Sequence, residues 1–318
     1  MSESTFPKDS RLICIDGHDL GLVERTGSFV LDERPEGKVT IIETGPSISV
    51  PFIKEALNNL NISLKEIENI IVTHIHLDHA GGAGILLEEC PNATVIVHPK
   101  GKRHLHNPSR LIQGAKAIYK EKFDTLFEPV IPIPEDRLRE MKDQETLQLS
   151  LGRTLTFYDT PGHAKHHFSI YDNVTETFFT GDTIGIRYPS IERQGISFYL
   201  PSTSPNQFNP DDMLHSLRRI ENIQPKQIAF GHFGISKETE KIYSEIRKWI
   251  PIFIDNGVRV VNKGGKWEEL RDILMDEIKK ELSSYGLEKD DSVYDIIDLD
   301  VTISAMGVMD YLLKNKSD

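Results

Sequence analysis

Cysteine is nearly missing from this sequence, and long apolar runs are missing altogether. Cys14 and Cys90 are the only cysteines among 318 residues, and both lie in apolar surroundings, so we expect two buried thiols and no disulfide. No run reaches the ~18 apolar residues that a membrane-spanning helix needs. Residues 1–5 have neither a basic start nor an apolar core, so we expect no signal peptide. These absences favour a cytoplasmic protein with no membrane segment.

Several signatures of other enzyme classes are also absent. The sequence has no Gly-x-Ser-x-Gly nucleophile motif, no phosphate-binding loop and no dinucleotide-binding fingerprint. Basic residues are also fewer than acidic ones: the sequence has 37 Lys and Arg and 49 Asp and Glu, which gives a net charge of −12. Phosphate backbones require a basic surface, so this balance disfavours a polynucleotide partner. A small-molecule substrate is the better expectation.

The charges are unevenly spread along the chain. Residues 268–298 carry eleven acids, which we interpret as a solvated helix face. Residues 100–122 are the reverse, with one acid, Glu121, against seven basic residues: Lys100, Lys102, Arg103, Arg110, Lys116, Lys120 and Lys122. For this basic stretch two interpretations stay open, a solvated helix face or a surface that attracts an anionic substrate.

Four metal-capable side chains fall within six positions, directly after an apolar run: His74, His76, Asp78 and His79. Alternation along an extended segment places His74 and His76 on the same side. Asp78 and His79 then lie where the chain turns, and the glycines at 81–82 ease the start of the next helix. Imidazole and carboxylate are preferred ligands of zinc. We therefore expect a metal site here rather than a His-rich surface loop.

The pattern His-x-His-x-Asp-His resembles that of the metallo-β-lactamase-fold metallohydrolase superfamily, particularly its glyoxalase II-like branch. The resemblance covers roughly residues 25–235 and implies three more ligands. His163 ends a Thr-Pro-Gly-His segment, Asp182 follows Gly181 after an apolar strand, and His232 follows a later strand. All of these positions come just after an apolar strand, where α/β folds place their sites.

The resemblance also implies how the ligands divide between two divalent metal ions. One ion is assigned His74, His76 and His163. The second is assigned Asp78, His79 and His232, and Asp182 bridges the pair. Zn²⁺ is the metal we expect, with iron or manganese as alternatives. Two cations lower the pKa of a shared water, so that a hydroxide can attack at neutral pH, and catalytic roles fall to Asp78 and Asp182.

Hydrophobic periodicity predicts an α/β protein. The resemblance specifies the class as an αββα metallo-β-lactamase sandwich with a helical C-terminal extension, and we predict a catalytic domain over 1–250 and the extension over 251–318. The segment 128–134 contains three prolines, so we expect an extended connection there. The predicted strands cover 11–15, 28–31, 38–42, 70–72, 94–97, 154–158, 168–171, 177–179 and 227–230. The predicted helices cover 50–60, 83–89, 102–122 with a break at 107–108, 211–222, 237–250, 267–285 and 300–313.

Other residues near the predicted ligands are weaker candidates. The resemblance places substrate contacts in the segment after Asp182, where Arg187, Tyr188 and Tyr199 lie. His167 follows His163 by four positions and is interpreted as either a support for a ligand or a core histidine. His166 is expected to be exposed.

The function that follows is a metal-dependent hydrolase whose hydroxide attacks an ester, thioester or lactone carbonyl of a small, anionic substrate. Two alternatives remain, a phosphodiesterase or ribonuclease of the same fold, and a di-iron redox enzyme. The C-terminal helices are candidates for pairing two copies of the chain as a homodimer.

Overall fold

The fold is described from a computed structural model, covering residues 11–35, 37–150 and 152–316. The chain forms two compact units. The first comprises Met1–Tyr158 with Ile170–Phe179, and the second comprises Asp159–Ser169 with Thr180–Asp318. Residues 1–5, for which the sequence predicts no signal peptide, lie outside the described residues.

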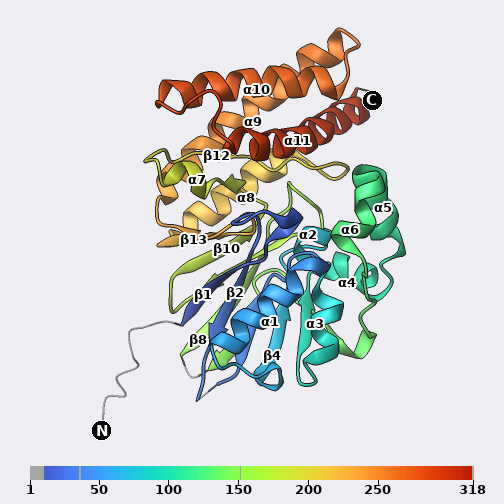
Figure 1. The fold of residues 1–318 in the computed structure, drawn as a ribbon, viewed down its shortest axis with the longest axis vertical. Coiled ribbons are helices and arrows are strands. Elements are labelled where there is room, and N and C mark those ends of the chain that lie inside the picture. Colours follow the sequence, from blue (N-terminus) through green and yellow to red (C-terminus); the bar gives the residue numbers. More distant parts are fainter. Residues whose placement is uncertain (1–10, 36, 151, 317–318) are drawn as a thin grey trace. The chain divides into compact units, whose positions relative to one another are not determined.

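The first unit contains a six-stranded sheet in the order β1-β2-β3-β4-β5-β6. Its strands β1, β2 and β4 are labelled in Figure 1. The first three strands pair antiparallel, whereas β3 to β6 pair in parallel. Ile and Val dominate the central strands and are fully buried, as expected for a sheet covered on both faces. The strands are β1 (Leu12–Asp16), β2 (Gly27–Asp32), β3 (Val39–Ile42), β4 (Ile67–Ile71), β5 (Thr94–Val97) and β6 (Leu138–Glu140).

Helices of the first unit pack on this sheet. Ile53 and Leu57, one turn apart on α1, join Ile41 and Ile70 of the sheet in one buried cluster. The break predicted at 107–108 separates α4 from α5, and the proline-rich segment 128–134 has no regular structure, as expected. The helices are α1 (Val50–Asn59), α2 (Leu77–Ala80), α3 (Ala83–Glu89), α4 (Pro99–His106), α5 (Ser109–Tyr119) and α6 (Phe123–Phe127).

A second six-stranded sheet has the order β14-β13-β10-β9-β8-β7. Within the first unit the two sheets meet where Phe29 of β2 packs edge-on against Phe179 of β10, with ring centroids 5.3 Å apart. Buried Arg153 of β8 binds Asp172 at 2.7 Å and Glu33 at 2.5 Å. The strands are β7 (Thr146–Ser150), β8 (Arg153–Asp159), β9 (Phe168–Asp172), β10 (Thr177–Gly181), β13 (Gln227–Phe230) and β14 (Ile235–Ser236).

The second unit is mainly helical. It contains the short pair β11 (Ile186–Arg187) and β12 (Tyr199–Leu200), α7 (Pro189–Glu192) between them, and α8 (Pro210–Ile223). Three long helices follow: α9 (Thr239–Asn262), α10 (Trp267–Ser284) and α11 (Val293–Asn315). These confirm the predicted helical C-terminal extension.

Two predicted helix limits are wrong. The helix predicted over 237–250 continues through Pro251 to Asn262. Proline inside a helix costs ~3 kcal/mol, but the buried face carrying Ile250, Phe253 and Val260 continues past it and offsets this cost. The last helix begins at Val293 rather than at residue 300. Residue 250 therefore falls inside α9, and the division into 1–250 and 251–318 stays a prediction.

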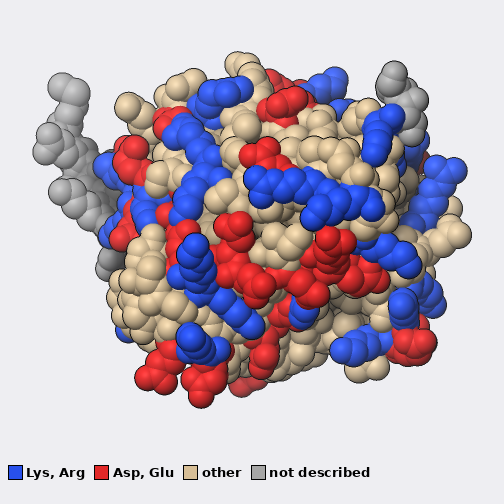
Figure 2. All heavy atoms as spheres, turned by 90° about the horizontal axis from the view of Figure 1, so that it is seen from above, with Lys and Arg blue, Asp and Glu red and all other residues tan. Residues whose placement is uncertain are grey.

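The acidic stretch 268–298 lies on α10, on the start of α11 and on the turn between them, and part of its charge is neutralised locally. Arg271 pairs with both Asp272 and Asp298, and Lys248 of α9 pairs with Glu281. Figure 2 shows Lys and Arg interspersed with Asp and Glu over one face of the molecule. None of the helices in the described residues is both long and apolar enough to cross a membrane.

Candidate metal centre

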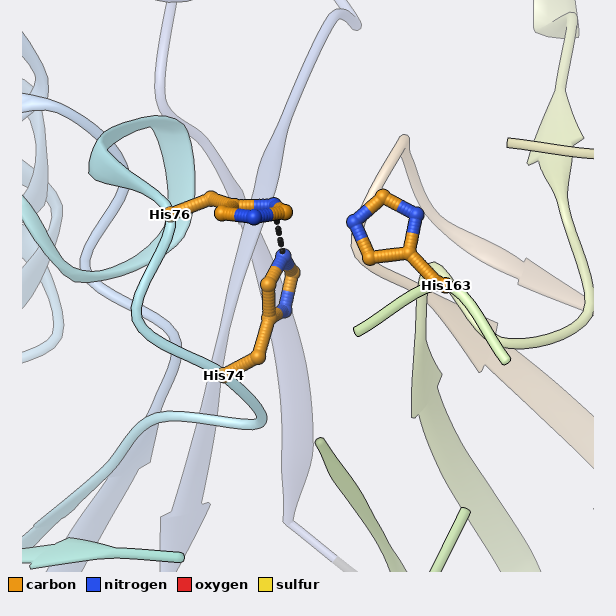
Figure 3. A group of neighbouring side chains, drawn as sticks. All are labelled: His74, His76 and His163. Carbon is orange, nitrogen blue, oxygen red and sulfur yellow. Dashed lines mark hydrogen bonds between the residues drawn. The ribbon is translucent and has the colours of Figure 1, made fainter. Parts of the chain in front are cut away.

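The first group of predicted ligands lies in the first unit, in the loop that follows β4. His74 Nε2 and His76 Nδ1 are 3.0 Å apart, so the two side chains point toward each other, on the same side as alternation predicts (Figure 3). His76 occupies the N-cap position of α2, and Asp78 and His79 lie within that short helix. His74 and His79 are buried, with ring centroids 4.2 Å apart. The loop thus concentrates imidazoles in the interior.

Hydrogen bonds fix how these rings are presented. Nδ1 of His74 lies 3.1 Å from the hydroxyl of Thr73, so Nε2 is the nitrogen directed toward His76. Nδ1 of His79 is paired with the carboxylate of Glu43. A ring that donates Nδ1–H to a carboxylate keeps a lone pair on Nε2, which is how metal-binding histidines are usually oriented.

Sequence reasoning missed Glu43, although a signal was present. This acidic residue directly follows β3 and is only 2% exposed. Its backbone N–H donates to Ile71 at 2.8 Å, and its Oε1 accepts the backbone N–H of Thr73 at 2.6 Å. A carboxylate placed directly after an apolar strand is rarely buried without a partner, and here the partner is a predicted ligand.

The second group of predicted ligands lies in the second unit. His163, Asp182 and His232 come just after β8, β10 and β13, and all three are at least 96% buried. Oδ2 of Asp182 lies 3.7 Å from Nε2 of His163 and 3.4 Å from Nε2 of His232. One carboxylate therefore lies beside two imidazoles.

Ser202 contacts two of these residues, and nothing in the sequence singled it out. Its backbone carbonyl accepts Nδ1–H of His163 at 2.9 Å, which leaves the lone pair on Nε2 (His163 is drawn in Figure 3). Its hydroxyl donates to Oδ2 of Asp182 at 2.9 Å. Ser202 thus orients a histidine and a carboxylate at once.

His167 is fully buried and bonded to the segment that carries Asp182. Its Nε2 accepts the backbone N–H of Asp182 at 3.3 Å, and its Nδ1 lies 3.0 Å from the hydroxyls of both Thr160 and Thr183. His167 is therefore a core histidine that also bonds the backbone of Asp182, and its support of a metal ligand stays a prediction. His166 is only 6% exposed, so the expectation that it is exposed is wrong. His166 lies two positions before the largely buried strand β9, and it is buried together with the start of that strand.

The three predicted substrate contacts are held by bonds within the second unit. Tyr188 donates its hydroxyl to Asp300 at 3.0 Å, and the Tyr199 hydroxyl lies 2.9 Å from that of Ser236. Burial raises the pKa of Tyr199 to about 12. Arg187 donates from Nη1 to the carbonyl of Phe233 at 3.1 Å, next to His232. Their contact with a substrate stays a prediction.

The donor chemistry of both groups fits divalent metal ions of the zinc type. The seven predicted ligands offer imidazole nitrogens and carboxylate oxygens, the ligands that zinc takes in catalytic sites. His79 and His163 have Nδ1 bonded to oxygen, which favours the tautomer that binds metal through Nε2. A cavity of about 530 Å³ in the second unit, between α8, α9 and α11, includes none of the predicted ligands among its lining residues.

The sequence matches the profile described as "Metallo-beta-lactamase superfamily" over residues 25–232. The chain therefore belongs to the metallo-beta-lactamase superfamily and is a metal-dependent hydrolase by class. It is similar to the metallo-beta-lactamase fold-containing protein ST1585 of Sulfurisphaera tokodaii, with 27% identity over 64% of this chain and 75% of that protein. It is also similar to a hydroxyacylglutathione hydrolase of Prochlorococcus marinus, with 27% identity over 46% of each chain.

Solved structures show the same fold. The metallo-beta-lactamase family protein TTHA1429 from Thermus thermophilus superposes with a TM-score of 0.66 at 17% identity, over 96% of this chain and 93% of that one. The ST1585 structure superposes with a TM-score of 0.62 at 23% identity, over 74% of this chain and 85% of that one. The predicted fold class, an αββα metallo-β-lactamase sandwich with C-terminal helices, is confirmed.

Proposed function

We propose that the chain is a dinuclear-metal hydrolase acting on a small ester, thioester or lactone. In this proposal His74, His76 and His163 hold one Zn²⁺, and a second group of ligands, Asp78, His79 and His232, holds the other. Asp182 is shared between the ions. The observation that carries the proposal is the side-by-side placement of Asp182 with His163 and His232 in a chain whose family membership is established.

Two such ions, when bound, supply a hydroxide at neutral pH and polarise the carbonyl under attack. The residues of the chain then have distinct tasks. Glu43 and Ser202 keep His79 and His163 in the tautomer that offers Nε2. Asp182 contributes a negative charge that offsets the charge of the cations. Because both groups of ligands are largely buried, little bulk water would compete with the substrate carbonyl for the metal ions.

The substrate class is inferred from two features. Similarity to a hydroxyacylglutathione hydrolase supports the glyoxalase II-like branch and hence a thioester. The basic stretch supports an anionic substrate, because Lys100, Arg103 and Arg110 are exposed on α4 and α5. Lys102 and Lys116 contribute less, since both lie within 4 Å of carboxylates.

The proposal also includes the expected size of the substrate, the location of the protein and the pairing of two copies. The net charge of −12 and the mixed charges visible in Figure 2 support a small molecule over a polynucleotide. We propose a cytoplasmic location and pairing of two copies through the C-terminal helices.

Elemental analysis of the purified protein, followed by a substrate panel, tests the proposal. We expect two equivalents of zinc per chain, and turnover of thioesters, p-nitrophenyl esters or lactones that stops on chelation and returns with added Zn²⁺. Turnover of bis-p-nitrophenyl phosphate alone would assign the phosphodiesterase alternative, and two equivalents of iron would favour the redox alternative. A protein that binds no transition metal would refute the metal centre itself.

A further inference from the structure

The last helix of the chain contacts the segment that contains Ser202. Thr203 donates its hydroxyl to the carbonyl of Ser304 on α11 at 2.9 Å, and its backbone N–H to the Ser304 hydroxyl at 3.4 Å. The Ser304 hydroxyl in turn reaches the carbonyl of Pro201 at 3.5 Å. All of these atoms lie in the second unit, and Ser304 and Thr203 are buried. The neighbours of Ser202 on both sides are therefore bonded to α11.

One glycine allows this contact. A Cβ atom at Gly307 would lie 1.6 Å from the carbonyl oxygen of Thr203 and 2.6 Å from its carbonyl carbon. No side chain can rotate away to relieve such an overlap, because both atoms belong to the backbone. Residue 307 must remain glycine for α11 to lie directly on the Thr203 backbone.

A third contact lies on the same face of the helix. Asp300, Ser304 and Gly307 are spaced four and three positions apart, which places them on one face of α11. Asp300 accepts the hydroxyl of Tyr188, which lies in the segment between β11 and α7. This face of α11 therefore contacts the chain at Tyr188 and again at Thr203, on both sides of Tyr199.

We propose that α11 positions the metal centre through Ser202. The sequence of contacts runs from Gly307 and Ser304 to Thr203, and from the adjacent Ser202 to His163 and Asp182. Ser202 is a positioning residue, since it acts on metal through the two ligands that it orients. The C-terminal extension is thus a part of the site's support, in addition to any role in pairing copies. This inference rests on the proposed function, because it needs His163 and Asp182 to be ligands.

Matched glycine substitutions separate this role from general effects on helices. Gly307→Ala places a methyl group against the Thr203 carbonyl, whereas Gly114→Ala adds the same group to α5, where nothing lies within 4 Å. We expect Gly307→Ala to weaken Zn²⁺ binding, measured by chelator competition, by roughly 10- to 100-fold, the usual effect of losing a ligand's support. Gly114→Ala should leave the zinc affinity at the wild-type value.

Polar substitutions test the same contacts without the steric overlap. Ser202→Ala removes the bond to Asp182 but keeps the carbonyl that orients His163, so zinc affinity should fall by roughly tenfold. Thr203→Val should also weaken zinc binding, and Thr203→Ser, which keeps the hydroxyl, should restore it. The visible absorption spectrum of the Co²⁺-loaded protein should change in Gly307→Ala, Ser202→Ala and Thr203→Val, and stay at the wild-type form in Gly114→Ala and Thr203→Ser.

Failure of this inference can be distinguished from failure of the proposed function. A wild-type chain that binds no metal overturns the proposed function. A metal-binding wild type whose zinc affinity is unchanged in both Ser202→Ala and Thr203→Val overturns the role of α11. Thermal unfolding of each variant without metal shows whether it folds, and if Gly307→Ala does not, the two polar variants decide.

Discussion

The carboxylate of Glu43 and Nδ1 of His79 form a buried hydrogen-bonded pair in the first unit, with 2% and 1% of each residue exposed. The second carboxylate oxygen accepts the backbone N–H of Thr73. The end of β3 is therefore bonded to the start and to the end of the loop that carries four predicted ligands. A single side chain fixes both the course of this loop and the tautomer of one histidine.

Glu43→Gln tests this pair with almost no change in volume. The amide oxygen can accept from only one of the two N–H groups well, and its NH₂ group then opposes the other donor. We expect zinc affinity to fall by roughly 10- to 100-fold, and the free energy of unfolding to fall by about 1–3 kcal/mol. Chelator competition and urea titration measure the two effects. Glu68→Gln, on the exposed side of β4, is the control, and equal zinc affinities in both variants would contradict the role of Glu43.

Asp182→Ala should have the largest effect on the metal centre. The substitution removes the carboxylate that lies beside His163 and His232, so turnover should be lost and the metal content should fall to one ion per chain or fewer. Elemental analysis and the substrate panel give the two readings. Asp211→Ala, at an exposed position of α8, should keep both at the wild-type level. Full activity in Asp182→Ala would falsify the shared-ligand role.

The basic stretch is tested by removing charge where carboxylates do not already neutralise it. A triple variant, Lys100→Gln, Arg103→Gln and Arg110→Gln, should raise KM for anionic substrates and leave KM for neutral ones unchanged. The effect should shrink as salt is added, because exposed charges are screened over ~10 Å at 0.1 M. Steady-state kinetics at two salt concentrations measure it. An unchanged KM for anionic substrates would assign the stretch to an ordinary solvated surface.

The sequence predicted the parts of this protein that depend on local pattern. The strand ends that carry His74, His163 and His232 could be predicted because apolar runs and a motif mark them. Glu43 and Ser202 were missed, since the histidines that they bond lie 36 and 39 residues away. Glu43 is marked only by its place directly after an apolar strand, and the backbone carbonyl of Ser202 leaves no mark in the sequence. The helix limit at Pro251 was wrong for a similar reason, because tertiary burial outweighed a local rule.

The two cysteines should differ sharply in reactivity. Cys90 is fully buried, and burial raises the pKa of its thiol to about 12, so almost no thiolate exists at pH 8. Cys14 lies on β1 and is only half-buried, so the expectation of two buried thiols is wrong for this residue. We expect iodoacetamide at pH 8 to alkylate Cys14 in the folded protein, and Cys90 only after denaturation in urea. Peptide mass spectrometry distinguishes the two sites, and equal labelling of both in the native protein would contradict the buried setting of Cys90.

Asp32, at the end of β2, should govern part of the stability toward acid. Burial alone would raise the pKa of this carboxyl, but Arg34 binds both of its oxygens at 2.9 Å and holds the pKa below its ordinary value of 3.8. The folded protein therefore favours the ionised form. The stabilisation is complete above roughly pH 5 and is lost as the pH falls through the lower pKa of the folded state.

Asp32→Asn removes this charge and should lower the free energy of unfolding at pH 7 by about 1–3 kcal/mol, since hydrogen bonds to a charged group are lost. The loss should shrink as the pH falls below 3.8, because the Asp32 carboxyl of the unfolded chain then takes up a proton, and it should vanish below the lower pKa of the folded state, where the folded carboxyl is neutral as well. Urea titrations from pH 7 down to the acid limit of folding measure the difference. The side chain of Glu135 is 74% exposed, so Glu135→Gln should change the free energy of unfolding very little at any of these pH values. A difference between wild type and Asp32→Asn that stays constant with pH would mean that the stabilisation comes from the shape of the side chain and not from its charge.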